Sequence, residues 1–165
     1  MAGKHEPLLV VGGGLGGASV ALALARKGFA VRLMEQAPEF GVIGFGIQLG
    51  PNVFPMFDRL GVSEAVLQHA IRPKAILMVD WIDGGELVRI PTGDSFAQRF
   101  KRPYVVIHRV DLHRILLDAC EKEANIELMP LTGAASFEDS GNRVRLLTTD
   151  NRVIEGSALD RKSVV

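Results

Sequence analysis

Three glycines and one acid near the N-terminus have the types and spacing that bind a dinucleotide. Gly12, Gly14 and Gly17 follow the pattern G-x-G-x-x-G. The first glycine permits a sharp turn, the second lets a diphosphate approach the backbone, and the third lets a helix lie close to a strand. Glu35 follows about 20 residues later, where a carboxylate can accept hydrogen bonds from ribose hydroxyls. These residues predict a site for an adenine dinucleotide.

The segments around these residues predict the elements that would position them. An apolar run over 8–11 precedes the glycines, an Ala- and Leu-rich stretch runs from Leu15 to Lys27, and a second apolar run over 29–34 ends at Glu35. This order predicts strand, turn, helix and strand, with the free N–H groups and the positive end of the helix dipole facing the phosphates. Because the acid disfavours a 2′-phosphate, the ligand is expected to be FAD or NAD rather than NADP. A structural βαβ unit without a ligand is the alternative.

The composition indicates an ordinary globular protein and argues against several classes of partner. With 165 residues, 47% of them hydrophobic, the chain is long enough to bury a core. Its 19 basic and 19 acidic residues balance without a basic patch, so no nucleic acid partner is expected. No apolar run is long enough to cross a membrane, and the short polar start predicts no signal peptide. The single cysteine, Cys120, is expected to be buried packing on a helix and suits the cytoplasm.

The rest of the chain predicts further helices and strands and one hairpin. Predicted helices cover 51–60, 63–70 and 110–123, and predicted strands cover 75–81, 86–90, 105–107, 126–128, 132–138, 143–149 and 152–155, the last three as a β-meander. Residues 41–50 and 91–102 are expected to be loops, and Asp83, Gly84 and Gly85 give a hairpin turn. The fold class is therefore α/β, a Rossmann-like domain with a parallel sheet plus a β-meander.

Some of these predictions concern single residues. The helix over 51–60 is expected to bury one apolar face, formed by Val53, Met56, Phe57 and Leu60. Ser63 is expected to be the N-cap of the next helix. His108 and His113 are five apart and do not share a helical face as metal ligands would, so both are interpreted as structural or solvated and no metal site is predicted.

Three segments resemble the FAD-dependent aromatic-ring monooxygenases, the single-component hydroxylases with the p-hydroxybenzoate hydroxylase fold. The first is the glycine pattern with Glu35 and Gln36; the second and third, which are more specific, are GFGIQLGPN over 44–52 and HRVDLH over 108–113. The resemblance covers nearly the whole chain. It is strongest to members that hydroxylate 3-hydroxybenzoate, followed by those that act on salicylate and on 6-hydroxynicotinate.

The resemblance implies which residues bind FAD. Gly14, Gly16 and Gly17 would lie against the pyrophosphate, and Glu35 with Gln36 would hold the adenosine ribose. The full implied set is Gly12, Gly14, Leu15, Gly16, Gly17, Glu35, Gln36, Gln48, Arg109 and Leu131.

Three of these assignments have alternatives. Gln48, in the loop that would pass the flavin, is equally expected to be a satisfied loop amide. Arg109, which would contact the flavin, is alternatively an ion-pair partner of Asp111 or Glu6. Leu131, whose backbone would meet the adenine, is alternatively an ordinary core residue.

The resemblance also implies the chemistry and the domains. In such enzymes NADH reduces FAD, the flavin binds O₂ as a C4a-hydroperoxide, and this electrophile hydroxylates a phenolic aromatic acid. The substrate would be a small aromatic acid such as 3-hydroxybenzoate, with salicylate or 6-hydroxynicotinate as the alternatives, and a homodimer is a further expectation. Residues 1–74 and 104–165 would form an incomplete FAD-binding domain, and residues 75–103 the start of a β-rich substrate domain.

The C-terminal segment departs from the family pattern. Asp160 and Ser163 resemble two residues of the family motif Gly-Ala-Asp-Gly-x-x-Ser, but the strand residues before the motif and its second glycine are missing. Family members are much longer, and their candidate base would lie beyond residue 165, so no catalytic residue is named. The chain is therefore expected to be truncated, to bind FAD weakly and to be inactive by itself. Two alternative functions stay open: a flavoprotein of the same fold that oxidises or reduces a non-aromatic substrate, and a nucleotide-binding or interaction module without turnover.

Overall fold

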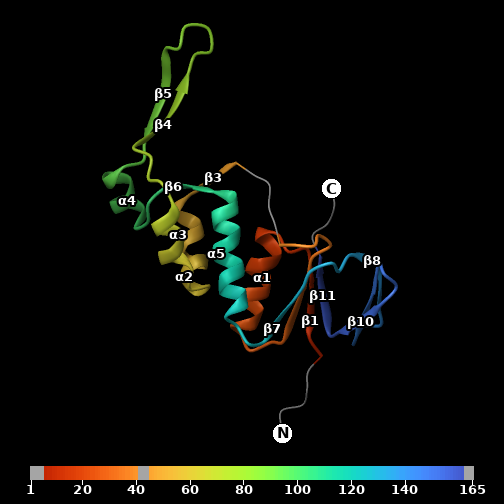
Figure 1. Cartoon of the computed structure of the whole chain (residues 1–165). Coiled ribbons are helices and arrows are strands. Elements are labelled where there is room, and N and C mark those ends of the chain that lie inside the picture. Colours follow the sequence, from red (N-terminus) through yellow and green to blue (C-terminus); the bar gives the residue numbers. More distant parts are fainter. Residues whose placement is uncertain (1–5, 41–44, 162–165) are drawn as a thin grey trace. The chain divides into compact units, whose positions relative to one another are not determined.

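The computed structural model describes residues 6–40 and 45–161, and its elements fall into two compact units (Figure 1). Unit 1 consists of the described residues of Met1–Ile43 and His113–Val165, and unit 2 consists of those of Gly44–Leu112. Each unit has its own strands and its own buried residues.

Unit 1 is built on a four-stranded parallel sheet with the order β11-β1-β2-β7. Its strands are β1 (Leu8–Val11), β2 (Val31–Met34), β7 (Ile126–Met129) and β11 (Ala158–Arg161). The helix α1 (Leu15–Ala25) connects β1 to β2, and α5 (Arg109–Glu121) leads into β7. The predicted βαβ unit and the α/β class are confirmed, since β1 pairs with β2, and β2 with β7, in parallel register.

Helix α1 covers one face of this sheet and the β-meander covers the other (Figure 1). The buried stripe of α1 is made of small and apolar side chains, namely Ala18, Ala21, Leu22 and Ala25. The meander is antiparallel and consists of β8 (Ala134–Asp139), β9 (Val144–Thr148) and β10 (Val153–Gly156). Leu9 and Met34 of the sheet form one buried cluster with Leu146 and Ile154 of the meander. Both faces of the parallel sheet are therefore covered, as such sheets require.

The strand β11 corrects the sequence analysis, which expected the strand residues of this segment to be missing. β11 pairs in parallel with β1, and its Leu159 stands opposite Leu9. The segment holds too few apolar residues to give a periodic signal, but the open edge of β1 offers it a row of hydrogen-bonding partners. Asp160 is an exposed residue of this strand, and Ser163 lies outside the described residues.

Unit 2 contains an antiparallel strand pair, helices and a hairpin. Its elements are β3 (Gly46–Leu49), the 3₁₀ segment η1 (Pro51–Val53), α2 (Phe54–Arg59), α3 (Ser63–His69), β4 (Ala75–Val79), β5 (Glu86–Pro91), α4 (Asp94–Phe100) and β6 (Val105–His108), followed by the start of α5. The predicted hairpin is confirmed, since β4 pairs antiparallel with β5 across a turn in which Gly84 has a φ of 73°. That residues 75–103 start a substrate domain stays a prediction.

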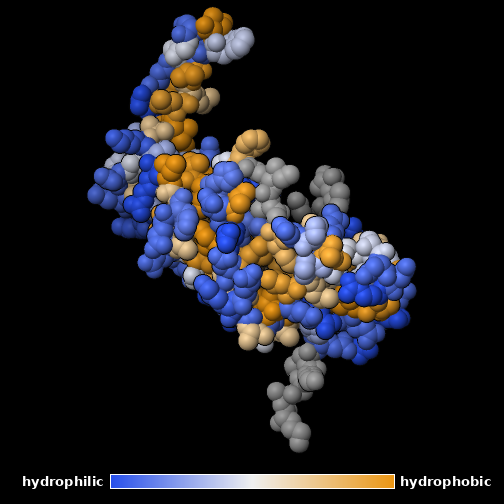
Figure 2. Space-filling model, viewed as in Figure 1, coloured by the Kyte–Doolittle hydropathy of each residue, from blue (hydrophilic) through white to orange (hydrophobic). Residues whose placement is uncertain are grey.

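The hairpin carries exposed apolar side chains along its length (Figure 2). They are Leu77, Met78 and Val79 on β4, and Leu87, Val88 and Ile90 on β5. Trp81, between the two strands, is 94% exposed. Exposed apolar side chains gathered in this way are uncommon on the surface of a soluble monomer.

Two segments that the sequence analysis predicts as loops contain regular structure. β3 lies within 41–50, of which residues 41–44 are outside the described part, and α4 lies within 91–102. The glycines around β3 weakened its strand signal in the sequence. The strand forms because β6 supplies its hydrogen-bonding partners. In α4 the rings of Phe96 and Phe100 lie 4.5 Å apart, so the four-residue spacing of the two aromatics was a helical signal.

The start of α2 changes which of its residues are buried. Met56 was predicted to face inward but is 50% exposed. The buried side chains here are Phe54, Phe57 and Leu60. The preceding 3₁₀ turn, with about three residues per turn, shifts the phase of the apolar face. Ser63 is not an N-cap either: Val62 occupies that position, and the Ser63 hydroxyl donates to Asp58 at 2.6 Å.

Candidate dinucleotide-binding site

The first glycine of the pattern makes the turn that leaves β1. Gly12 has a φ of 103°, in the left-handed region that side chains disfavour. Its N–H donates to the carbonyl oxygen of Met34 at 2.8 Å, which ties the turn to the end of β2. The position therefore requires glycine, as the sequence analysis predicted.

The last glycine brings α1 against this turn. A Cβ on Gly17 would stand 1.8 Å from the Gly12 carbonyl oxygen and 3.4 Å from the side chain of Leu33. No side chain larger than hydrogen fits at that distance from a backbone atom. Gly17 therefore fixes the close approach of helix and strand that its place in the pattern predicts.

The glycines between them face open space. A Cβ on Gly14 or on Gly16 would meet no atom within 4 Å. Gly14 is the N-cap residue of α1 and no side chain caps it, and α1 begins at Leu15. A helix N-terminus with free backbone N–H groups attracts anions, and the open backbone leaves room for a diphosphate. The residues present therefore fit the diphosphate of a dinucleotide such as FAD.

The carboxylate of Glu35 points at the glycine turn. Its Oε2 accepts from the Gly13 N–H at 2.8 Å, and its Oε1 accepts from the Ala37 N–H at 2.9 Å. An ionised carboxylate has about four acceptor positions, so two remain for ribose hydroxyls. The ring of Phe40 lies against Gly13, where an added Cβ would stand 2.3 Å from Phe40 Cδ1. Gln36 is exposed beside Glu35.

His113 also contacts the turn, which the sequence analysis did not predict. It is 2% exposed, and its Nε2 lies 2.6 Å from the carbonyl oxygen of Gly13. The interpretation of His113 as structural is therefore confirmed, with a specific partner. The contact spans 100 positions in sequence, so no local spacing could have indicated it.

Leu131 lies beside the backbone that carries Glu35. Its N–H donates to the Ala37 carbonyl oxygen at 3.0 Å, and the Thr132 N–H donates to the Glu35 carbonyl oxygen at 2.8 Å. Leu131 has a φ of 52° and its side chain is 65% exposed, so the alternative of an ordinary core residue is wrong. The structure thus brings Leu131 together with Glu35 in unit 1.

Gln48 and Arg109 belong to unit 2, where two of the resembling segments meet. β3 pairs with β6 so that Gly46 stands opposite His108, and the Arg109 N–H donates to the Phe45 carbonyl oxygen at 3.1 Å. Gln48 is an exposed residue of β3, and its side chain makes no hydrogen bond to any residue of the described ranges. The roles of both residues toward FAD stay predictions.

The ion-pair alternatives for Arg109 are not found. Within residues 6–40 and 45–161, Arg109 forms no ion pair with Asp111, and the carboxylate of Glu6 instead pairs with Arg143 at 2.5 Å. The Arg109 side chain is exposed.

Cys120 is buried, as predicted, and its thiol is unreactive at neutral pH. Its thiol donates to the Ala18 carbonyl oxygen at 3.4 Å. Burial raises the pKa of the Cys120 thiol to about 11, with a smaller contribution from the nearby Glu123 carboxylate. A thiol with a raised pKa is a poor nucleophile at neutral pH.

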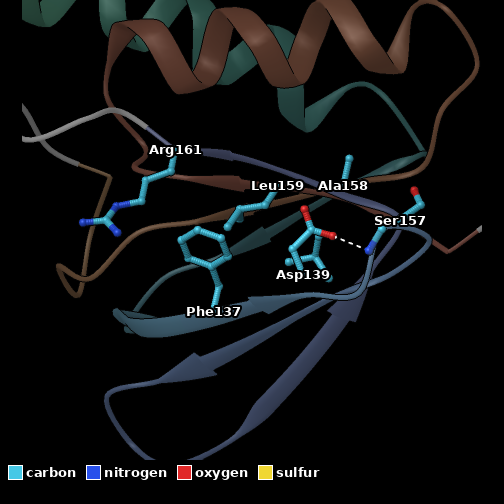
Figure 3. Close-up of a pocket in the computed structure, with 8 residues that line it drawn as sticks. Phe137, Asp139, Ser157, Ala158, Leu159 and Arg161 are labelled. Carbon is cyan, nitrogen blue, oxygen red and sulfur yellow. Dashed lines mark hydrogen bonds between the residues drawn. The ribbon is translucent and has the colours of Figure 1, made fainter.

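A cavity of about 710 Å³ lies elsewhere in unit 1, between the meander and β11 (Figure 3). Phe137 and Asp139 line it from β8, and Leu159 and Arg161 line it from β11. Asp139 accepts a hydrogen bond from the Gly141 N–H at 2.7 Å. None of the predicted dinucleotide-binding residues lines this cavity, so it is separate from the glycine turn.

Neither a cluster of metal-ligating side chains nor a membrane-spanning helix is present in the part of the chain that the structure describes. No group of three or more His, Cys, Asp or Glu side chains there could hold a metal ion. No helix of that part has the length and apolar character needed to cross a membrane.

Comparison with known proteins gives matches over nearly the whole chain. A family model described as FAD binding domain matches residues 6–160. The chain is 46% identical over 153 residues to a 3-hydroxybenzoate 6-hydroxylase from Polaromonas naphthalenivorans, covering 93% of this chain and 38% of that protein. It is 41% identical over 119 residues to a 6-hydroxynicotinate 3-monooxygenase from Bordetella bronchiseptica, covering 72% of this chain and 31% of that protein.

A solved structure supports the fold. The p-nitrophenol 4-monooxygenase from Pseudomonas putida superposes with a TM-score of 0.84 over 98% of this chain and 40% of that one, at 18% identity. At that identity the match shows the fold alone. The chain spans 38% of the length of the Polaromonas relative.

Proposed function

The chain belongs to the FAD binding domain family, and from this premise we propose that it supplies the dinucleotide-binding part of a flavin-dependent hydroxylase of phenolic aromatic acids. One arrangement carries the proposal: the Glu35 carboxylate lies 2.8 Å from the Gly13 N–H, beside an uncapped helix N-terminus whose Gly14 and Gly16 face open space. In this arrangement the diphosphate binds the helix N-terminus and the ribose binds Glu35.

The proposed substrate is 3-hydroxybenzoate, supported by the similarity to the Polaromonas hydroxylase. Salicylate and 6-hydroxynicotinate are the alternatives, the latter supported by the Bordetella relative. The net reaction would convert the phenol, O₂, NADH and a proton into the hydroxylated phenol, NAD⁺ and water. Bound FAD would supply the redox chemistry. The residues of this chain would bind and orient it, with Arg109 and the backbone near Gln48 toward the flavin.

A cytoplasmic location and a homodimer are further parts of the proposal. The location is supported by the free, buried thiol of Cys120, which needs no oxidising compartment.

A nucleotide-binding module without turnover is the second candidate function. The glycine turn and the Glu35 carboxylate would serve such a module equally, since they bind nucleotide without taking part in turnover. In this case the chain binds the adenine half of FAD weakly and oxidises no NADH.

Two measurements on the purified chain test these candidates. FAD and ADP binding are measured by titration calorimetry, and NADH oxidation is followed with FAD and each of the three phenols. Binding of both nucleotides with phenol-stimulated NADH oxidation supports the hydroxylase, and binding without oxidation supports the module. Failure of a folded chain to bind either nucleotide would contradict both. Retention of one FAD per chain through gel filtration would contradict the expected weak binding.

A further inference from the structure

The two peptide groups that flank Gly13 each form a hydrogen bond, and the two bonds have different partners. The Gly13 N–H donates to Glu35 Oε2 at 2.8 Å, and the Gly13 carbonyl oxygen lies 2.6 Å from His113 Nε2. We propose that His113 is a positioning residue of the dinucleotide site: it donates to the Gly13 carbonyl and thereby aims the Gly14 N–H at the diphosphate. This inference rests on the proposed function.

The planarity of the peptide bond carries the first step. The Gly13 carbonyl and the Gly14 N–H belong to one planar trans peptide group, so they point in opposite directions. A hydrogen bond that fixes the carbonyl toward His113 therefore fixes the Gly14 N–H on the side away from α5. Within the described residues the Gly14 N–H has no acceptor, and the space beside Gly14 is open. An oxygen of a bound diphosphate would give this N–H the acceptor that it lacks.

The backbone of the glycine turn is flexible, so an outside hydrogen bond is needed to orient the Gly13–Gly14 peptide group. Gly12, Gly13 and Gly14 are consecutive, and glycine backbones reach many conformations at little cost. A donor outside the turn reduces the number of orientations that the Gly13–Gly14 peptide group samples. The ligand then binds a backbone that is already oriented, which lowers the entropic cost of binding.

The position of His113 is itself fixed by the packing of α5. The imidazole is 2% exposed. Two turns further along the same helix, the Cys120 thiol donates to the Ala18 carbonyl oxygen of α1 at 3.4 Å. Leu116, between them, is 1% exposed. The donor is therefore held at a set distance from the helix whose N-terminus would bind the diphosphate.

The contact requires one protonation pattern. A carbonyl oxygen can only accept, so Nε2 must carry a hydrogen. The first test measures this by ¹⁵N NMR of the histidine rings in the full, ligand-free chain at neutral pH. A protonated Nε2 in His113 is the expected result. An Nδ1–H tautomer with an unprotonated Nε2 would overturn the proposal whatever the affinity for FAD.

The second test separates positioning from packing. His113→Leu keeps a bulky buried side chain without the donor, and His113→Gln restores an N–H donor of similar reach. His69→Leu is the matched control, since His69 is exposed and contacts the Ala65 carbonyl of its own helix at 2.8 Å. All three are compared with the parent chain for ADP affinity and for the ¹H–¹⁵N signal of Gly14.

The expected results differ between the variants. His113→Leu should bind ADP about tenfold more weakly, the size of one net hydrogen bond, and should shift the Gly14 amide signal. His113→Gln should recover most of the affinity, and His69→Leu should match the parent. Equal ADP binding and an unmoved Gly14 signal in a folded His113→Leu chain would overturn the proposal. If the Leu variant does not fold, a folded His113→Gln chain that lacks ADP binding would overturn it. If the parent does not bind ADP, the proposed function fails, and the Gly14 signal and the tautomer still decide whether the His113 contact exists.

Discussion

The carbonyl oxygen of Gly12 occupies the position that a side chain at Gly17 would need, since a Cβ there would stand 1.8 Å away. The two ends of the glycine pattern thus touch each other, whereas Gly14 and Gly16 face open space. The glycines therefore divide into two kinds, with the outer pair forming the turn and the inner pair leaving room for a ligand.

We expect Gly17→Ala to destabilise the fold. The clash is with backbone, which cannot move aside as a flexible side chain could, and overpacking of this kind costs roughly 3 kcal/mol. Urea denaturation followed by circular dichroism measures the loss. Gly16→Ala is the matched control: it meets no atom within 4 Å and should keep or slightly raise stability, because alanine is the better helix former. Equal stability of the two variants would contradict this division.

Glu35→Gln should weaken nucleotide binding and its selectivity. An amide at this position cannot accept from both the Gly13 and Ala37 N–H groups as the carboxylate does. The parent chain should bind ADP in preference to adenosine 2′,5′-bisphosphate, and the variant should lose about tenfold in ADP affinity and most of this preference. Calorimetric titration with both nucleotides measures this. Glu39→Gln, an exposed acid nearby, is the control and should bind as the parent does.

The glycine turn could be predicted from sequence because each of its positions has its own backbone requirement. Gly12 needs a positive φ and Gly17 has no room for a Cβ, so both positions require glycine and are recognisable in the sequence by their fixed spacing. The partner of Gly13 could not be predicted in this way. His113 lies 100 positions away, and only the packing of α5 brings it to the turn.

The misassigned strands have a related cause. β3 is four residues long and begins at a glycine, and β11 has few apolar residues, so neither gives a strong strand signal in the sequence. Each forms because another strand offers hydrogen-bonding partners, β6 for β3 and β1 for β11. Tertiary pairing of this kind outweighs intrinsic strand preference.

The buried thiol of Cys120 should make stability depend on pH in the alkaline range. Folding raises its pKa from 9.0 to about 11, so the folded state keeps a proton that the unfolded state releases. The contribution is fully present below pH 9, falls as the pH rises from there, and levels off above about pH 11. Urea denaturation of the parent and of Cys120→Ala at pH 8 and at about pH 10 tests the sign. A parent that loses no more stability than the variant over this interval would contradict it.

Trp81 should report an uncovered hairpin. It is the single tryptophan and is 94% exposed, so its emission should resemble that of a free indole in water and should be quenched fully by acrylamide. Trp81→Lys should change the free energy of unfolding by less than about 0.5 kcal/mol, as exposed substitutions do. Blue-shifted, protected emission in the parent chain would mean that a second copy covers the hairpin.

The most direct test of the account is to locate the bound dinucleotide on the chain by NMR. The ¹⁵N-labelled chain is titrated with FAD while the backbone amide signals are followed. We predict that the largest shifts fall on Gly14, Gly16 and Gly17 and on the amides held by Glu35. A chain that binds FAD while these signals stay unmoved would contradict the assignment of the diphosphate to the glycine turn.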